Sequence, residues 1–367
     1  MREGSGPGGP SLPPGPVVVW GAGAMGGSIG AWLHRAGRDV LLVDRDPDHV
    51  VAVRRDGLRI TGPVDAFTRR VPILLPREVA PAAPLGVVLL AVKAHHTAEA
   101  VAALAPHLSP DGFVVSVQNG LNERTIAEVV GAGRTVGCFV NFGADVVEPG
   151  VVMRGNRGAV VIGELDGRRT RRIEALHALL RDFEPDAVLT DNIHGYLWGK
   201  LAYGAILFAT ALTDATIADV LASERHRPAL VGLAREVMAV AAARAVRPEG
   251  FDGFDPAAFV PGAPEDGAAA TLDALVDFNR ASAKSRSGVW RDLAVRKRKT
   301  EVDAQIAVIA ELGGTVGVPT PLVTRLVRLV HDVEKGRREQ SWGTLDALTE
   351  PGDGAGGGAG PGATVGP

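Results

Sequence analysis

Short apolar runs alternate with amphipathic segments over the first half of the chain. The runs occupy residues 17–20, 39–44, 86–92, 113–117 and 134–140. Runs that are apolar on both faces are typical of strands in a parallel sheet covered by helices. Helical periodicity occupies residues 28–38, 97–108 and 171–182. This order predicts an α/β, Rossmann-like amino-terminal domain with a doubly wound parallel sheet.

The strand pattern stops at about Asp191, and the rest of the chain has helical periodicity. The expected helices cover residues 193–212, 216–223, 229–245, 268–280, 299–312 and 321–335. We therefore expect a dinucleotide-binding domain over residues 17–190 and an all-α domain over residues 191–348. The ends, residues 1–16 and 349–367, are rich in Gly, Pro, Ala and Ser and are predicted to be disordered tails.

The first apolar run leads into a G-x-G-x-x-G turn, which is typical of dinucleotide binding when it joins a strand to a helix. Its residues are Gly21, Ala22, Gly23, Ala24, Met25 and Gly26. The glycines allow a sharp turn, a close approach of backbone to a pyrophosphate, and close packing of helix on strand. Free N–H groups at the helix start would face the anion. The alternative is a glycine-rich turn without a ligand.

An acidic residue ends the second run, where dinucleotide folds place a carboxylate on the adenosine ribose. Asp44 lies 18 residues after Gly26, and Arg45 follows it. A carboxylate here binds ribose hydroxyls and repels a 2′-phosphate. The sequence therefore mildly favours NADH over NADPH, although Arg45 could offset that repulsion.

Length, net charge, cysteine content and the length of apolar runs limit the classes of protein to which the chain can belong. At 367 residues the chain is long for one core, and its net charge of -3 gives no general attraction to nucleic acid. The basic run at residues 296–299 is interpreted as a solvated helix face. Cys138 is the only cysteine, and no apolar run reaches membrane-spanning length, so we expect a cytoplasmic protein without membrane partners.

Five polar residues are candidates for chemistry. Lys93 and Asn119 directly follow predicted strands, at the sheet edge where ligands bind, although a strand-capping lysine and an Asn-Gly turn explain them equally. Lys200 lies in a very apolar helix. Either its side chain reaches to solvent, or it is held in a partly dry cleft, where desolvation would lower its pKa and suit it to act as a general acid.

Two further candidates lie late in the chain. Glu301 is expected in the second turn of a helix. Its side chain is expected either to pair with Lys297 one turn earlier or to lie at the rim of the buried face of that helix. Ser287 is expected in a loop. The pair His95-His96 is expected to point in two directions, and no histidine has zinc-type spacing with cysteine, so no metal site is predicted.

Taken together, these motifs resemble the ketopantoate reductase (2-dehydropantoate 2-reductase) family over roughly residues 17–350. The matching motifs are the glycine turn, Lys93, Asn119 in Gln-Asn-Gly, Lys200 in Trp-x-Lys-Leu, and Ser287 with the late Asp-Leu and Lys-Thr-Glu. The resemblance implies NAD(P)H-dependent reduction of a 2-oxo acid, most simply 2-dehydropantoate in pantothenate biosynthesis. It assigns proton donation to Lys200, substrate carboxylate binding to Ser287, and cofactor or substrate contact to Lys93, Asn119 and Glu301.

Three departures leave the substrate open. Gly204 and Thr210 stand where the family has substrate-binding asparagines, and the interval from Ser287 to Glu301 is about two residues longer than usual. The alternatives are a paralogue for another oxo acid or a secondary-metabolite ketone, and a non-catalytic dinucleotide-binding protein that uses the basic run for partners. The apolar helices are also compatible with a homodimer.

Overall fold

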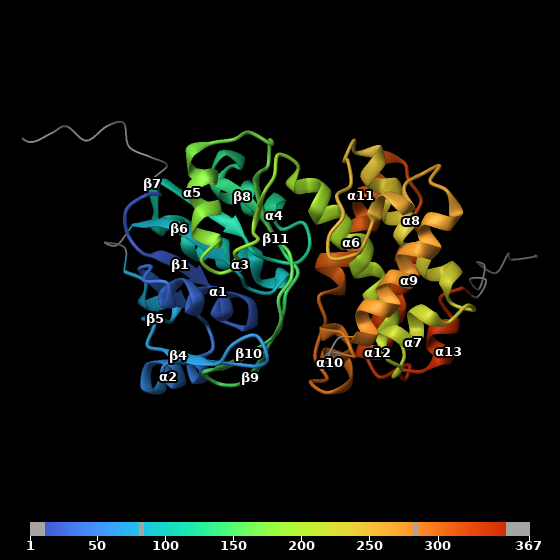
Figure 1. Ribbon diagram of the computed structural model, residues 1–367, viewed down its shortest axis with the longest axis horizontal. Helices are drawn as coiled ribbons and strands as arrows, with labels where there is room; N and C mark the ends of the chain where they lie inside the picture. The colour runs from blue at the N-terminus through green and yellow to red at the C-terminus, as the bar shows by residue number, and fades with distance from the viewer. Residues whose placement is uncertain (1–11, 81–83, 282–284, 350–367) are drawn as a thin grey trace, which may run out of the picture.

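The computed structural model describes residues 12–80, 84–281 and 285–349, which form a sheet-based half and a helical half (Figure 1). The sheet-based half contains the elements up to Leu189, and the helical half begins with the long helix α6 (Ile193–Thr210). Residues 12–16 of the predicted amino-terminal tail are described, and Leu12 packs against the core. The rest of that tail and residues 350–367 lie outside the described residues.

An eight-stranded sheet forms the centre of the first half. Its spatial order is β12 (Val188–Leu189), β11 (Val160–Glu164), β8 (Thr135–Val140), β7 (Leu108–Ser116), β6 (Leu85–Leu90), β1 (Val17–Trp20), β2 (Val40–Val43) and β5 (Ile73–Leu74). The strands from β5 to β8 pair in parallel, whereas β11 is antiparallel to β8. The predicted sheet is thus confirmed as mostly parallel. The order reverses beside β1, which is where such sheets bind ligands.

Helices cover both faces of this sheet, as the alternation of strand side chains requires. Val17 and Val19 point into a core shared with α1 (Ala24–Arg35) and α5 (Arg171–Leu180). Val18 and Trp20 point into a second core shared with α3 (Thr97–Leu104) and α4 (Glu123–Val130). The helix α2 (Pro47–Asp56) follows β2 and is capped by the Asp46 carboxylate.

A second, four-stranded sheet covers α1 (Figure 1). Its order is β4 (Phe67–Arg69), β3 (Leu58–Thr61), β10 (Val151–Asn156) and β9 (Gly143–Glu148). The strand β9 was not expected from the sequence, because its side chains are only partly buried and give no apolar run. It is nevertheless important, because it borders the space between the two halves.

A buried arginine holds this second sheet to α1 and to the loop after α5. Arg154 on β10 is 1% exposed, donates to the Glu184 carboxylate at 3.2 Å, and lies with its guanidinium carbon 4.1 Å from the Phe183 ring centroid and 4.7 Å from that of Trp32. Buried charges are tolerated only when they are paired in this way.

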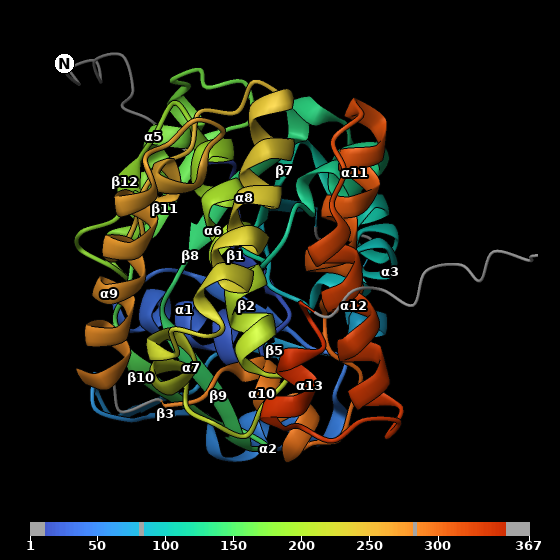
Figure 2. The same ribbon diagram turned by 90° about the vertical axis from the view of Figure 1, so that its right-hand side faces the viewer.

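The helical half is built around α6 (Figure 2). The surrounding helices are α7 (Ile217–Ala222), α8 (Arg227–Ala243), α9 (Glu265–Ala281), α10 (Gly288–Ala294), α11 (Val308–Val316), α12 (Pro321–Glu334) and α13 (Trp342–Asp346). The core of this half also includes Phe139 of β8 and Val161 of β11, so that α6 packs on the sheet as well. The predicted all-α second half is confirmed.

Several predicted boundaries were wrong. The helix expected over residues 97–108 ends at Leu104, because a 3₁₀ turn containing Pro106 follows at Ala105–His107 and β7 begins at Leu108. The helix expected over residues 299–312 begins later, with a π-helical turn at Asp303–Ala307 that leads into α11. The basic run at residues 296–299 is therefore an irregular segment after α10 and not a helix face.

Candidate active site

A cavity of about 760 Å³ lies between the two halves. Its walls are the glycine turn, the carboxyl ends of β2, β6, β7 and β8, one side of α6, and the segment from Ser287 to Gln305. It therefore lies at the edge of the sheet that the topology singles out for a ligand.

The glycine turn has the geometry that its sequence predicts. Gly21 has a φ of +103°, and a Cβ there would lie 2.7 Å from the backbone nitrogen of Val92. A Cβ on Gly26 would lie 2.1 Å from the Gly21 carbonyl oxygen, so α1 packs directly on the turn. In contrast, a Cβ on Gly23 would meet nothing within 4 Å, and no side chain caps α1. The first amides of α1 are thus available to an anion.

The other residues of the turn divide between cavity and core. Ala24 and Met25 line the cavity together with Gly21 and Gly23. Ala22 is fully buried beneath the turn, where it packs in the core and does not line the cavity.

The second strand ends in the same cavity. Asp44 and Arg45 both line it. One carboxylate oxygen of Asp44 accepts a hydrogen bond from the Asp46 backbone nitrogen at 2.9 Å. The Arg45 guanidinium lies 3.2 Å from Nδ1 of His96 and 3.8 Å from the Glu99 carboxylate. An anionic and a cationic side chain therefore border the expected ribose position.

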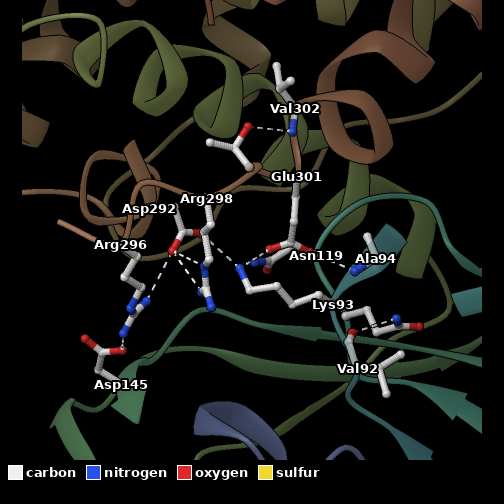
Figure 3. A network of polar contacts seen from close by, with 12 residues as sticks. Val92, Lys93, Ala94, Asn119, Asp145, Asp292, Arg296, Arg298, Glu301 and Val302 are labelled. Carbon is white, nitrogen blue, oxygen red and sulfur yellow. Dashed lines mark hydrogen bonds and ion pairs between the residues drawn. The ribbon is translucent and has the colours of Figure 1, made fainter. Parts of the chain in front are cut away.

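Lys93 is held by carboxylates from the other half of the molecule (Figure 3). Its ammonium lies 3.0 Å from Oε2 of Glu301 and 3.2 Å from Oδ2 of Asp292. The second oxygen of Glu301 accepts from the Ala94 backbone nitrogen at 2.8 Å. Glu301 therefore contacts Lys93 instead of Lys297, and it precedes the helix in which it was expected.

The ion pairs continue along the cavity to β9 (Figure 3). Asp292 also accepts from Arg298 at 2.8 Å and from Arg296 at 3.2 Å. Asp145 of β9 binds Arg296 and, at 2.5 Å, Arg291. Burial alone would raise the pKa of Asp145, but the two guanidiniums hold it below its usual value. Charged contacts thus join the second sheet to α10 across the cavity.

Lys200 projects from α6 to the ends of two strands. Its ammonium donates to Oδ1 of Asn119 at 2.7 Å and to the carbonyl oxygen of Val140. It lies 5.2 Å from the Phe139 ring centroid. Desolvation is the main cause that lowers the pKa of Lys200, to about 8. Of the two alternatives left by the sequence, the lysine in a cleft is the one observed.

Two of the three remaining substrate-contact predictions fall in the cavity. Ser287 lines it, and its hydroxyl caps α10 by accepting from the Trp290 nitrogen at 3.1 Å. Gly204 lines it one helical turn after Lys200. Thr210 does not line the cavity: it is buried, and its hydroxyl donates to the Leu207 carbonyl oxygen at 2.8 Å. The cavity-facing residue at that level is Phe208.

Other residues of the site were missed. Asp145, Arg291 and Arg296 have no sequence signal, since they meet across more than a hundred residues. Leu207 could have been found, because it lies seven residues, or two helical turns, after Lys200 and thus on the same helical face. The rings of His95 and His96, expected to diverge, lie 4.1 Å apart.

Two features of other protein classes are absent from the described residues. Among residues 12–80, 84–281 and 285–349, no group of three or more His, Cys, Asp or Glu side chains could hold a metal ion. Within that same part of the chain, no helix combines the length and apolarity needed to cross a membrane.

Comparison with known proteins identifies both halves. Residues 17–167 match the family described as "Ketopantoate reductase PanE/ApbA", and residues 192–334 match its "C terminal" model. A 2-dehydropantoate 2-reductase of Mesorhizobium japonicum is 29% identical, with 87% of this chain and 98% of the relative covered.

Solved structures agree with this fold. A ketopantoate reductase of Ralstonia eutropha superposes with a TM-score of 0.71 at 25% identity, covering 88% of this chain and 99% of that one. A D-mandelate dehydrogenase with NADH and anilino(oxo)acetate has a TM-score of 0.76 at 23% identity, over 87% and 98% of the two chains.

Proposed function

The chain belongs to the ketopantoate reductase family of oxidoreductases, and we propose that it reduces a small 2-oxo acid with a reduced nicotinamide cofactor, with Lys200 as general acid. The observation that carries the proposal is the ammonium of Lys200, held at the strand ends inside the cavity that begins at the glycine turn. The names of relatives make 2-dehydropantoate the first substrate to test.

The residues of the cavity fit a dinucleotide. The open space at Gly23 and the uncapped start of α1 suit a pyrophosphate, which the α1 amides would bind. Asp44 would accept hydrogen bonds from the adenosine ribose. Its charge would repel a 2′-phosphate, so we propose a small preference for NADH that Arg45 limits. When bound, the cofactor supplies the hydride.

Lys200 would supply the proton. Reduction of a ketone leaves negative charge on the carbonyl oxygen, and an ammonium beside that oxygen both stabilises the charge and protonates it. The lowered pKa of about 8 supports this role, because an acid with a pKa near the working pH donates readily. Asn119 and the Val140 carbonyl would hold the ammonium in position.

The remaining site residues would position the reactants. Ser287 caps a helix start on the cavity wall, where its hydroxyl hydrogen is free to bind a substrate carboxylate. Asn119 would contact the substrate or the nicotinamide beside Lys200. Glu301 and Lys93 bind each other across the cleft, and their polar atoms would face the cofactor ribose. We assign Lys200 and Glu301 to the catalytic group.

The non-catalytic alternative loses its support. It rested on a free basic run, but Arg296 and Arg298 are bound to Asp145 and Asp292 within the cleft.

The test is to mix the purified protein with NADH or NADPH and a panel of 2-oxo acids, and to follow loss of the reduced-nicotinamide absorbance. Lys200→Ala should lower kcat by about 10²–10⁴-fold, the usual range for a general acid, while cofactor affinity is retained. Lys335→Ala, at an exposed position after α12, is the matched control. Normal turnover by Lys200→Ala would refute the assignment.

A further inference from the structure

We infer that the cavity takes a 2-oxo acid with a bulky apolar side chain that carries no hydroxyl. This inference rests on the proposed function, since it assigns a side-chain class to the oxo acid that Lys200 would protonate. It is argued from the wall that α6 presents to the cavity. That wall consists of Lys200, Leu201, Tyr203, Gly204, Leu207 and Phe208.

Gly204 differs from the other glycines of the same helix. A Cβ on Gly195 would lie 2.3 Å from the Arg247 carbonyl oxygen, and one on Gly199 would lie 2.9 Å from that of Glu249. Close packing therefore requires glycine at both positions. A Cβ on Gly204 would meet nothing within 4 Å.

The space at Gly204 opens on the cavity. Glycine weakens a helix interior relative to alanine, and no protein group near Gly204 requires it. The absence of a side chain therefore leaves room for a ligand, one helical turn from the ammonium of Lys200.

Apart from Lys200, this wall is mostly apolar. Leu207 and Phe208 are apolar, and Tyr203 is 9% exposed with its ring packed against Phe251 and Phe254. The Thr210 hydroxyl donates to the helix backbone and lies outside the cavity. A substrate hydroxyl placed against this wall would lose its hydration without a replacement bond.

The polar side chains of the cavity lie on its other walls. Asn119 binds Lys200, and Asn141 donates to the Asp252 carboxylate at 2.7 Å. Ser287 remains for the carboxylate. Gln305 lies in the π-helical turn and not on α6. Its Cγ is 3.5 Å from the position that a Cβ on Gly120 would occupy. The α6 side is thus the apolar side of the pocket.

The experiment compares kcat/KM for three acids with the same cofactor. The acids are 2-dehydropantoate, 3,3-dimethyl-2-oxopentanoate, in which a methyl replaces its hydroxyl, and phenylglyoxylate. We expect both hydroxyl-free acids to exceed 2-dehydropantoate by about tenfold or more, up to the roughly 100-fold that an apolar pocket achieves against an added hydroxyl.

Two variants at one position separate space from hydrogen bonding. Gly204→Asn places an amide in the open space and should reduce the preference for the hydroxyl-free acids by about tenfold, partly by raising kcat/KM for 2-dehydropantoate. Gly204→Ala fills space without a polar group, so it should slow phenylglyoxylate without helping 2-dehydropantoate. Thermal melting of both variants verifies that they fold.

The outcomes distinguish this inference from the proposed function. Preferred turnover of 2-dehydropantoate by the native protein overturns the inference and leaves 2-oxo acid reduction standing. Failure to reduce any acid overturns the proposed function. In that event, the thermal shift of the cofactor-loaded protein is measured with each acid: a larger shift with the hydroxyl-free acids, lost in Gly204→Ala, supports the inference, and equal shifts overturn it.

Discussion

The ammonium nitrogen of Lys200 lies 2.7 Å from the side-chain oxygen of Asn119, and this hydrogen bond joins the helical half to the strand ends of the sheet. Asn119 lies in the turn after β7, and Lys200 lies in the third turn of α6. The residue that would donate the proton is therefore positioned by the same sheet edge that would hold the cofactor.

The rate of reduction should fall as the pH rises through the pKa of Lys200. Burial lowers that pKa to about 8, and the acid acts only when it is protonated. We expect kcat/KM to decrease about tenfold per pH unit above about 8 and to level off below it. The measurement is a pH series with a fixed oxo acid. In Lys200→Ala the residual rate should lack this alkaline limb; an identical limb there would assign it to another group.

Removing the Asp44 carboxylate should shift the cofactor preference toward NADPH. The charge of Asp44 opposes a 2′-phosphate, and Arg45 then faces it without competition. For Asp44→Ala we expect the ratio of NADPH to NADH affinity to rise by about tenfold, or ~1.4 kcal/mol, as measured by quenching of protein fluorescence. Asp48→Ala, in the exposed first turn of α2, should leave the ratio unchanged.

Neutralising Asp292 should loosen the cleft. Its carboxylate, 6% exposed, faces Lys93, Arg296 and Arg298, which would repel one another without it. Since these cations are partly solvated, we expect Asp292→Asn to lower the free energy of unfolding by only about 1–3 kcal/mol. High salt should reduce this difference by screening the repulsion. Asp266→Asn, at an exposed site on α9, is the control for urea titrations with and without salt.

Glu123 should make the fold less stable as the pH rises from about 4.5 to about 7. Desolvation raises its pKa from 4.5 to about 7, so the folded state binds a proton that the unfolded state releases over this interval. Glu123→Gln removes this effect and should gain about 1–3 kcal/mol at pH 8 and little at pH 4.5. Urea unfolding at both values tests this, and an equal gain at the two would argue against titration of Glu123.

Truncating Arg154 should destabilise the sheet-based half strongly. The change leaves the carboxylate of Glu184, 3% exposed, with only the partly exposed Arg157, and opens space among Trp32, Phe142 and Phe183. Breaking a buried pair costs about 3–5 kcal/mol. Thermal melting measures this loss. In the same measurement Arg55→Ala, whose partner Asp56 is a solvent-exposed neighbour, should lower the melting temperature far less.

The sequence predicted those parts of the site whose chemistry is local. The glycine turn, Asp44, Lys93 and Asn119 each follow a strand, so the fold class alone places them at one edge. Lys200 could be placed beside them only through the family resemblance, because periodicity does not fix the contact between the halves.

The errors have equally specific causes. Thr210 was assigned by its place in a motif, whereas the 3.6-residue period of α6 places Gly204 and Leu207 beside Lys200 on the cavity face. The role of Asp145 could not be predicted, because β9 is half-buried and its ion pairs depend on how the two halves meet. The basic run was misassigned because its segment is irregular, so that Arg296 and Arg298 turn back to Asp292 and Arg296 also reaches the distant Asp145.

The helix α6 connects the two halves rigidly, because it packs on both. Its first residue, Ile193, is wedged against Gly137 and Gly163 of the sheet, while its later turns form the centre of the helical core. Moving Lys200 away from the sheet would require Ile193 to leave its contacts with Gly137 and Gly163. Ligands should therefore enter on the side of α10, where ion pairs to Asp145 connect Arg291 and Arg296 to β9. Because salt screens such pairs, the cleft should open more readily as the ionic strength rises.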